Sequence, residues 1–207
     1  MNNFVIFSGG EIFDYSVVKL YKYSRIICAD SGLYHCEKLE IVPDIVIGDF
    51  DSFEGEINPD CKVIKTSPEK DDTDTMMCVK YAIENGAGNI KIYGGLSGRL
   101  DHTVANIQTL KYCAERNVRA VIDDGLNRAL VQGEKSMCQY LKNDSEYFSV
   151  FSLTDKVFIR ELSGVKYPLE NYYLTSGFPL GVSNEITSLR ATLEVSDGYA
   201  LIIFSKK

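Results

Sequence analysis

The chain has 207 residues, of which 45% are apolar, and this is enough to build one large domain or two small ones. A net charge of −7, a pI near 4.9 and the lack of any run of Lys or Arg exclude a nucleic-acid-binding surface. The first residues lack the pattern of a secretory signal, and no segment approaches the roughly 18 apolar residues of a membrane span, so we expect a soluble, cytoplasmic protein.

The first half of the chain alternates short apolar runs with helical patterns. Several runs are continuous stretches of β-branched residues, which are typical of strands buried on both faces of a parallel sheet. The clearest helix spans residues 75–85, where Met76, Val79 and Ile83 form an apolar stripe and Gly86 is placed to end the helix. The pattern predicts an α/β N-terminal domain with a mostly parallel sheet. Its predicted strands are residues 4–7, 25–29, 44–47, 62–65, 90–93 and 119–122.

Each predicted strand is followed by glycine, serine or aspartate. Ligands of open α/β sheets bind beyond the carboxyl ends of the strands, although any one of these loops could be a simple turn. Together the loops bring Asp49, Asp51, Asp71, Asp74 and Asp101 to one edge of the sheet, where their mutual repulsion favours a bound cation. Magnesium is the expected cation because it prefers oxygen ligands and bridges carboxylates to phosphates.

Zinc is not an expected ligand of this chain. The six cysteines include no C-x-x-C pair, and only two histidines, His35 and His102, could join them in a metal site. The spacing favours isolated, reduced thiols in a reducing compartment.

The stretch from residue 94 to residue 106, GGLSGRLDHTVAN, joins the fifth strand to a helix. Apolar residues from Val104 to Ala114 recur three or four apart, as one face of a helix requires. The amino terminus of a helix carries unpaired N–H groups and a partial positive charge, so a glycine-rich turn there suits a phosphate. Arg99 adds a cation and Asp101 a carboxylate, which could also serve as the N-cap of the helix.

After residue 125, short alternating runs replace the helical patterns, and they predict a small antiparallel sandwich or barrel. The last pair of runs gives the firmest strand prediction. Residues 189, 191, 193 and 195 are apolar and alternate with polar ones, and Asp197-Gly198 is expected to form a two-residue hairpin turn. We therefore predict domains at residues 1–125 and 126–207, the second an all-β, sandwich-like C-terminal domain. Its predicted strands are residues 129–132, 137–141, 147–153, 157–162, 186–195 and 199–204.

Five short blocks occur in order over nearly the whole chain. They are Gly48-Asp49-Phe50-Asp51-Ser52, Lys70-Asp71-Asp72-Thr73-Asp74, Gly94-Gly95 through Gly98-Arg99-Leu100-Asp101-His102, Gly164-Val165-Lys166-Tyr167-Pro168-Leu169 and Gly181-Val182-Ser183-Asn184-Glu185. Any one block would be a weak signal, but five in this order resemble the motifs of the thiamine pyrophosphokinase family.

The resemblance implies transfer of the diphosphoryl group of ATP to the hydroxyl group of thiamine, which gives thiamine diphosphate and AMP. It implies an ATP-binding α/β domain over residues 1–125 and a β-sandwich over residues 126–207 that contributes to thiamine binding and dimerisation. The expected cofactor is Mg²⁺, ATP is the co-substrate, and the assembly is a homodimer with active sites between subunits. Neither nucleic acid nor a membrane is an expected partner.

The same resemblance assigns roles to individual residues. The metal is expected on Asp71, Asp74 and Asp101, with Asp49 as a further ligand, and Arg99 completes the catalytic set by stabilising charge on the phosphates. One carboxylate would accept the proton of the thiamine hydroxyl; Asp71 is the first candidate, and the sequence leaves the choice open. The expected ATP-binding residues are Asp30, Ser31, Asp49, Asp51, Lys70, Gly95, Gly98 and His102, and the expected thiamine-binding residues are Ser183 and Asn184.

Some members of the family place a tryptophan against thiamine, whereas this chain has none. Tyr172, Tyr173 or Phe178 could take that place. Simpler interpretations also stay open, since His102 could be only a residue of the first helical turn, and the Asp30-Ser31 pair could be only a turn.

Two other functions are compatible with the residues. A metal-dependent phosphohydrolase would use aspartates at strand ends to activate water and would not need thiamine. A non-catalytic thiamine- or nucleotide-binding module would use the carboxylates only to anchor a metal.

Overall fold

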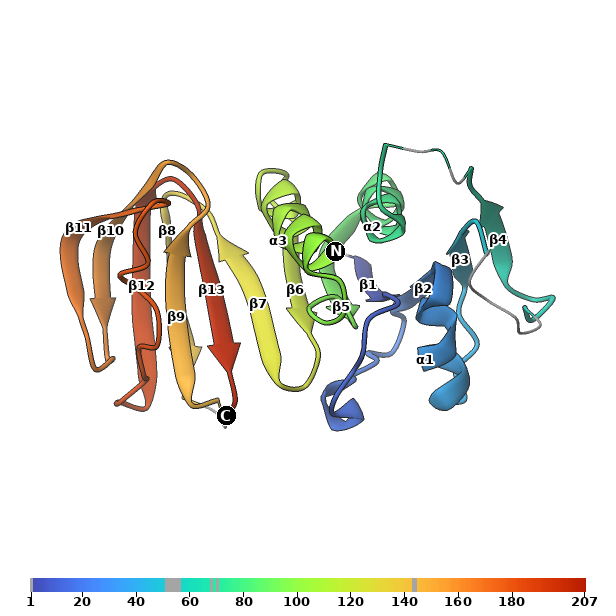
Figure 1. The fold of residues 1–207 in the computed structure, drawn as a ribbon, viewed down its shortest axis with the longest axis horizontal. Coiled ribbons are helices and arrows are strands. Elements are labelled where there is room, and N and C mark those ends of the chain that lie inside the picture. Colours follow the sequence, from blue (N-terminus) through green and yellow to red (C-terminus); the bar gives the residue numbers. More distant parts are fainter. Residues whose placement is uncertain (1, 51–56, 68, 70, 143–144) are drawn as a thin grey trace. The chain divides into compact units, whose positions relative to one another are not determined.

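The computed structural model describes residues 2–50, 57–67, 69, 71–142 and 145–207. The chain forms two compact units, Met1–Gly125 and Leu126–Lys207, which are called unit 1 and unit 2 below. The helices and strands of both units are labelled in Figure 1.

Unit 1 contains a parallel sheet with the strand order β4-β3-β2-β1-β5-β6. Its strands are β1 (Asn2–Phe7), β2 (Arg25–Ala29), β3 (Ile45–Gly48), β4 (Lys62–Lys65), β5 (Ala87–Tyr93) and β6 (Arg119–Asp123). Every neighbouring pair is parallel, so the carboxyl ends of these strands lie at one edge of the sheet. Val5, Ile6 and Phe7 are at most 1% exposed, which confirms that an apolar run such as β1 is buried on both faces.

The two long helices of unit 1 are α2 (Asp74–Glu84), which precedes β5, and α3 (Leu100–Ala114), which precedes β6. Gly86 follows the C-cap of α2 with φ of +79°, and its N–H donates to the carbonyl of Ile83, so the predicted helix end is confirmed. Among the helices of the described residues, none is both long and apolar enough to cross a membrane.

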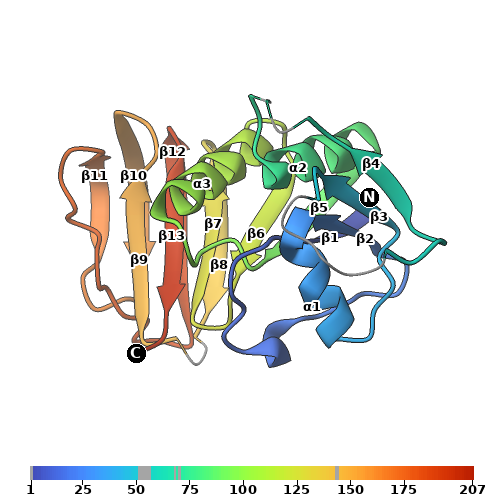
Figure 2. The same cartoon turned by 45° about the vertical axis from the view of Figure 1, so that its right-hand side comes forward.

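A short helix that the sequence did not reveal lies on the face of the sheet turned away from α2 and α3. Helix α1 (Leu33–Lys38) has only six residues, too few to display a helical period, and it follows the 3₁₀ turn η2 (Asp30–Gly32); a second such turn, η1, spans Tyr15–Val17. Leu33 and Cys36 of α1 pack with Val5 and Phe7 of β1. Figure 2 shows α1 in front of the strands of unit 1.

All six cysteines are free in the structure. Two of them are not isolated, however, because the Sγ atoms of Cys28 and Cys36 lie 3.2 Å apart in the core between β2 and α1. The contact with Cys36 and burial both raise the pKa of the Cys28 thiol.

Unit 2 is a sandwich of two antiparallel sheets. Strands β7 (Asn127–Gln132), β13 (Ala200–Ser205) and β9 (Tyr147–Ser152) are neighbours in that order, and the second sheet has the order β11 (Leu169–Thr175), β10 (Lys156–Ser163), β12 (Arg190–Asp197), β8 (Ser136–Leu141). Val150 and Ile202 from one sheet and Ile159 and Leu193 from the other belong to a single core. The sandwich-like fold class is thereby confirmed.

The predicted hairpin at Asp197-Gly198 is wrong. Strand β12 pairs with β10 and β8, whereas β13 pairs with β7 and β9, so the short connection passes from one sheet to the other. The alternation of Ala191, Leu193 and Val195 is as predicted, since all three are fully buried, but Leu189 is 73% exposed and precedes the strand. The alternation of apolar and polar residues predicts which face of a strand is buried. A turn sequence such as Asp-Gly does not determine which strands pair.

Candidate active site

The loops that follow the strands of unit 1 gather at the carboxyl edge of the sheet. We call this edge the strand-end rim and define it by residues 8–10, 30–31, 48–50, 71–75 and 94–101. The parallel register aligns Phe7 with both Cys28 and Tyr93, so the loops after β1, β2 and β5 begin at the same level. The rim therefore contains the predicted residues of unit 1 that the structure describes, apart from His102, which follows Asp101 directly; Asp51 and Lys70 lie outside the described residues.

The loops after β1 and β5 are fixed to one another by backbone contacts. The N–H of Gly10 donates to the carbonyl of Gly94 at 2.9 Å, and the hydroxyl of Ser97 donates to the carbonyl of Glu11 at 3.1 Å. Gly94 has φ of +74°, and a Cβ atom there would lie 2.5 Å from the Gly10 carbonyl oxygen. Glycine is required at this position because no side chain fits between the two loops.

Two buried polar residues that the sequence did not single out support these loops. The side-chain amide of Asn106 on α3 donates to the carbonyl of Gly95 at 2.9 Å. His35 on α1 is 8% exposed and places Nε2 2.8 Å from the carbonyl oxygen of Gly10, while its Nδ1 lies 2.7 Å from the hydroxyl of Tyr15. Burial lowers the pKa of His35, so the neutral ring donates from Nε2 and accepts from Tyr15.

The loops after β2 and β3 meet at Asp30. Its Oδ1 accepts a hydrogen bond from the N–H of Phe50 at 3.2 Å, and a Cβ atom on Gly48 would lie 2.9 Å from the Asp30 Cα atom. Asp30 and Phe50 both have φ in the left-handed region, at 45° and 63°, which L-residues adopt at a cost of about 1 kcal/mol each. Ser31 lies beside the β1 loop, where its Oγ atom would be 2.1 Å from a Cβ on Gly9.

Helix α2 begins at the rim. Thr73 is its N-cap and accepts from the N–H of Met76 at 3.2 Å, and Asp74 is the first helical residue. The buried hydroxyl of Thr75 lies 2.6 Å from that of Ser8, which joins the start of α2 to the end of β1. The unpaired N–H groups of this first turn lie beside the glycine loop.

The carboxylates that precede Asp74 differ in their partners. Asp72 forms an ion pair with Lys80 of α2, with Oδ2 and Nζ 2.5 Å apart. Asp71 is exposed and makes no hydrogen bond or ion pair with the described residues. Asp71 is therefore available to a ligand, whereas Asp72 is held by the helix.

Helix α3 begins at the same rim with an exposed ion pair. The Arg99 guanidinium donates to Asp101 twice, from Nη2 to Oδ2 at 2.6 Å and from Nε to Oδ1 at 3.2 Å. This contact lowers the pKa of Asp101, and the backbone N–H of His102 contributes to the same shift. Asp101 lies inside the first turn, and the N-cap is Arg99, so the capping role considered for Asp101 is wrong. Arg99 itself makes no side-chain cap.

Among the described residues, no group of three or more His, Cys, Asp or Glu side chains is arranged to hold a metal ion. Asp49, Asp71, Asp74 and Asp101 thus reach one edge of the sheet without forming a closed cage. Their donor atoms are carboxylate oxygens, which suit Mg²⁺, and Mg²⁺ usually takes only one or two carboxylates together with phosphate oxygens and water. The donor set therefore fits a metal that shares its coordination with a triphosphate.

In unit 2, the two predicted blocks at residues 164–169 and 181–185 lie side by side. Asn184 is 4% exposed; its Oδ1 accepts from the N–H groups of Tyr167 and Glu185, and its Nδ2 donates to the carbonyl of Tyr167 at 2.8 Å. The Lys166 ammonium pairs with Glu185 at 2.7 Å. The Asn184 side chain therefore holds the two loops together, while Ser183, with φ of 56°, is exposed beside it.

The three aromatic residues considered as replacements for tryptophan are all exposed. Tyr173 packs on Phe158, with ring centroids 4.7 Å apart, on the outer face of the sandwich. Tyr172 is 43% exposed on the opposite side of β11, and Phe178 is 63% exposed in the segment that follows this strand. Phe178 is the most exposed of the three, and Tyr173 is the one whose ring already contacts another aromatic ring.

Comparisons with known proteins cover both units. The family model "Thiamin pyrophosphokinase, catalytic domain" matches residues 19–122, and "Thiamin pyrophosphokinase, vitamin B1 binding domain" matches residues 138–200. The chain is 28% identical over 186 residues to a thiamine pyrophosphokinase of Bacillus subtilis, with 86% of each chain covered. It is 28% identical over 171 residues to thiamin pyrophosphokinase 1 of Caenorhabditis elegans, which covers 79% of this chain and 69% of that one.

Solved structures agree with these matches. The crystal structure of thiamine pyrophosphokinase from Bacillus subtilis superposes with a TM-score of 0.90 at 27% identity, over 100% of both chains. The thiamin pyrophosphokinase of Geobacillus thermodenitrificans gives a TM-score of 0.86 at 26% identity, over 100% of this chain and 98% of that one.

Proposed function

Since the chain belongs to the thiamine pyrophosphokinase family, we propose that its reaction takes place at the strand-end rim. The reaction is transfer of the diphosphoryl group of ATP to the hydroxyl group of thiamine, which yields thiamine diphosphate and AMP. In this proposal unit 1 binds ATP, and unit 2 contributes to thiamine binding and to a homodimer.

The observation that carries this placement is the meeting of two glycine loops and two helix starts at one edge. Gly10 is bonded to Gly94, and Ser8 is bonded to Thr75 in the first turn of α2. Glycine N–H groups and the first turns of α2 and α3 supply donors and partial positive charge for a triphosphate. The expected ATP-binding residues of the described chain, Asp30, Ser31, Asp49, Gly95, Gly98 and His102, lie in or next to these loops.

We assign the metal to Asp71, Asp74 and Asp101, with Asp49 as a further ligand. Bound Mg²⁺ supplies neutralisation of the negative charge on the phosphate oxygens. The exposed Arg99–Asp101 pair supports this assignment, because a triphosphate that competes for the Arg99 guanidinium frees the Asp101 carboxylate. Arg99, together with Lys70, then stabilises the charge on the transferring group.

The chemistry requires alignment and one proton transfer. The thiamine hydroxyl oxygen bonds to the β phosphorus, the bond from this phosphorus to the oxygen shared with the α phosphate breaks, and AMP leaves. Asp71 is the preferred acceptor for the hydroxyl proton because its carboxylate has no partner among the described residues. Asp101 is a weaker base, since Arg99 lowers its pKa.

The loops at residues 164–169 and 181–185 are proposed to bind thiamine. Asn184 sets the shape of these loops through its hydrogen bonds with Tyr167, and the exposed hydroxyl of Ser183 is available to the substrate. Tyr172 or Phe178 offers ring surface for the positively charged thiazolium. The free thiols support the further proposal that the protein works in the cytoplasm.

The proposal is tested by incubating purified protein with thiamine, ATP and Mg²⁺ and identifying the products by mass. We expect thiamine diphosphate and AMP in equal amounts, with no reaction when Mg²⁺ is removed. Formation of ADP, or release of phosphate without thiamine, would reject diphosphoryl transfer and favour the phosphohydrolase.

A further inference from the structure

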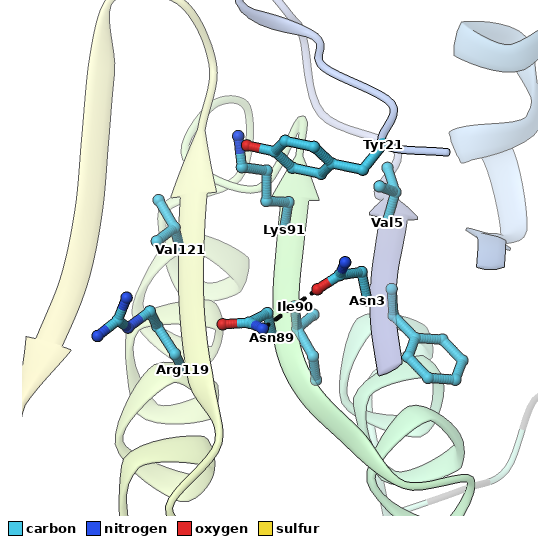
Figure 3. A pocket seen from close by; sticks show the side chains of 9 residues that line it. Asn3, Val5, Tyr21, Asn89, Ile90, Lys91, Arg119 and Val121 are labelled. Carbon is cyan, nitrogen blue, oxygen red and sulfur yellow. Dashed lines mark hydrogen bonds between the residues drawn. The ribbon is translucent and has the colours of Figure 1, made fainter. Parts of the chain in front are cut away.

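Unit 1 contains a hollow of about 410 Å³ on the sheet face turned away from α2 and α3, over β1, β5 and β6 (Figure 3). Residues from alternate positions of the three strands form two rows across it. Asn3, Asn89 and Arg119 are partners in one row, and Val5, Lys91 and Val121 in the next. Period-two alternation places all six side chains on this face.

The charges that line the hollow are all positive. Lys91 and Arg119 are its ionisable cations, and the other ionisable lining group is Tyr21. Neither cation makes a hydrogen bond or ion pair with the described residues; Lys91 instead holds its ammonium 5.2 Å from the centroid of the Tyr21 ring. In a chain with 29 acidic and 22 basic residues, two cations without carboxylate partners in one hollow favour an anion.

The rest of the lining suits an organic body. Val121 provides apolar surface, and Tyr21 closes one side of the hollow, as Figure 3 shows. Asn89 donates from Nδ2 to Oδ1 of Asn3 at 3.1 Å, which leaves the Nδ2 group of Asn3 and the Oδ1 atom of Asn89 for a ligand. The volume lies in the range of about 300–1,000 Å³ that is usual for small-molecule sites.

We propose that this hollow binds a small organic anion, with a phosphate or carboxylate group at Lys91 or Arg119 and a flat apolar body against Tyr21 and Val121. The site is separate from the reaction, because its residues lie on the face of the sheet and the strand-end rim lies at the carboxyl edge. The two asparagine side chains fix the orientation of the ligand between the cations.

The test is a titration of the ¹⁵N-labelled full chain with phenyl phosphate and with benzoate, followed by backbone NMR shifts. We expect saturable shifts at Val5, Asn89 and Lys91, and the tighter of the two probes identifies the anionic group. Inorganic phosphate, which lacks the apolar body, is expected to bind at least about tenfold more weakly.

Lys91→Ala and Arg119→Ala should each weaken the preferred probe by about tenfold. Lys62→Ala is the matched control: Lys62 is also a strand lysine beside a tyrosine ring, 5.3 Å from the centroid of Tyr81, and it lies outside the hollow. Lys91→Gln removes the charge with less change in packing and keeps the test valid if Lys91→Ala does not fold.

Three results overturn the proposal. One is the absence of saturable shifts, and another is shifts that persist unchanged in both the Lys91 and Arg119 variants. The third is a set of shifts at Val5 and Asn89 that follows protein concentration and not the probe, which would mean that a second copy of the chain covers this face. The readout is binding, so the result does not depend on the activity assigned to the rim.

Discussion

His35 holds Gly10 in place: its Nε2 atom lies 2.8 Å from the Gly10 carbonyl oxygen, at the loop that meets the Gly94 loop on the rim. The ring is buried between α1 and β1, so this hydrogen bond connects the core of unit 1 to the proposed phosphate-binding loops. The protonation state of His35 therefore affects the stability of unit 1.

His35→Gln tests this connection. Burial holds the folded-state pKa of His35 below its unfolded value, with Lys38 acting in the same direction. The unfolded chain then binds more protons as pH falls through the unfolded pKa of about 6.5, so wild-type stability decreases with falling pH until the folded pKa is passed. We expect the melting temperature of His35→Gln to fall less than that of wild type between about pH 7.5 and pH 5.5. Parallel melting curves would contradict the assignment.

Asp101→Asn should reduce turnover by at least about 100-fold while leaving thiamine binding within about twofold, since the change removes a charge that acts on the phosphates. Asp72→Asn is the control, because Asp72 lies near Asp71 in sequence but is paired with Lys80. Its turnover is expected to stay within about twofold of wild type. Steady-state kinetics measures the turnover of each variant, and a thiamine titration measures its thiamine binding. Equal losses in the two variants would mean that general negative charge matters and the proposed ligands do not.

Gly94→Ala and Gly98→Ala separate backbone strain from steric conflict. Both glycines have positive φ, at 74° and 81°, but a Cβ on Gly94 would meet the Gly10 carbonyl, whereas Gly98 has nothing within 4 Å. We expect Gly98→Ala to lower the free energy of unfolding by about 1 kcal/mol and Gly94→Ala by about 3 kcal/mol. The loss is larger for Gly94→Ala because its Cβ also displaces the Gly10 loop. Thermal unfolding of the two variants gives the comparison, and similar losses would show that the loops are not rigidly joined.

Asn184→Ala should destabilise unit 2 by about 2 kcal/mol, because it leaves the N–H and carbonyl of Tyr167 without their partner. The KM for thiamine should rise together with this loss. Ser183→Ala changes the neighbouring exposed residue and should leave the melting temperature within about 1 °C of wild type, as is usual for exposed sites. A rise in KM in Ser183→Ala alone would indicate direct contact of its hydroxyl with thiamine.

The strands of unit 1 could be predicted because each is a short β-branched run. That the Gly, Ser and Asp residues after them lie at one edge of the sheet follows from the parallel topology. Helix α1 and strand β11 could not be predicted, since α1 has only six residues and the residues of β11 are mostly exposed. The roles of His35, Asn106 and Thr75 were also missed. Each is a buried polar side chain that forms a hydrogen bond with a backbone or hydroxyl group in a different loop or strand. No local sequence pattern marks such a pair.

The path of the chain from β12 to β13 has a consequence for synthesis. Strand β13 pairs with β7 on one side and β9 on the other, so β7 and β9 are not joined in one sheet until Ala200–Ser205 has been made. Unit 1 has all its strands once residue 125 is complete and can fold while translation continues, whereas β9 lacks its partner strand until β13 has been made near the end. Between the synthesis of β9 and that of β13, the edge of β9 is therefore open to aggregation.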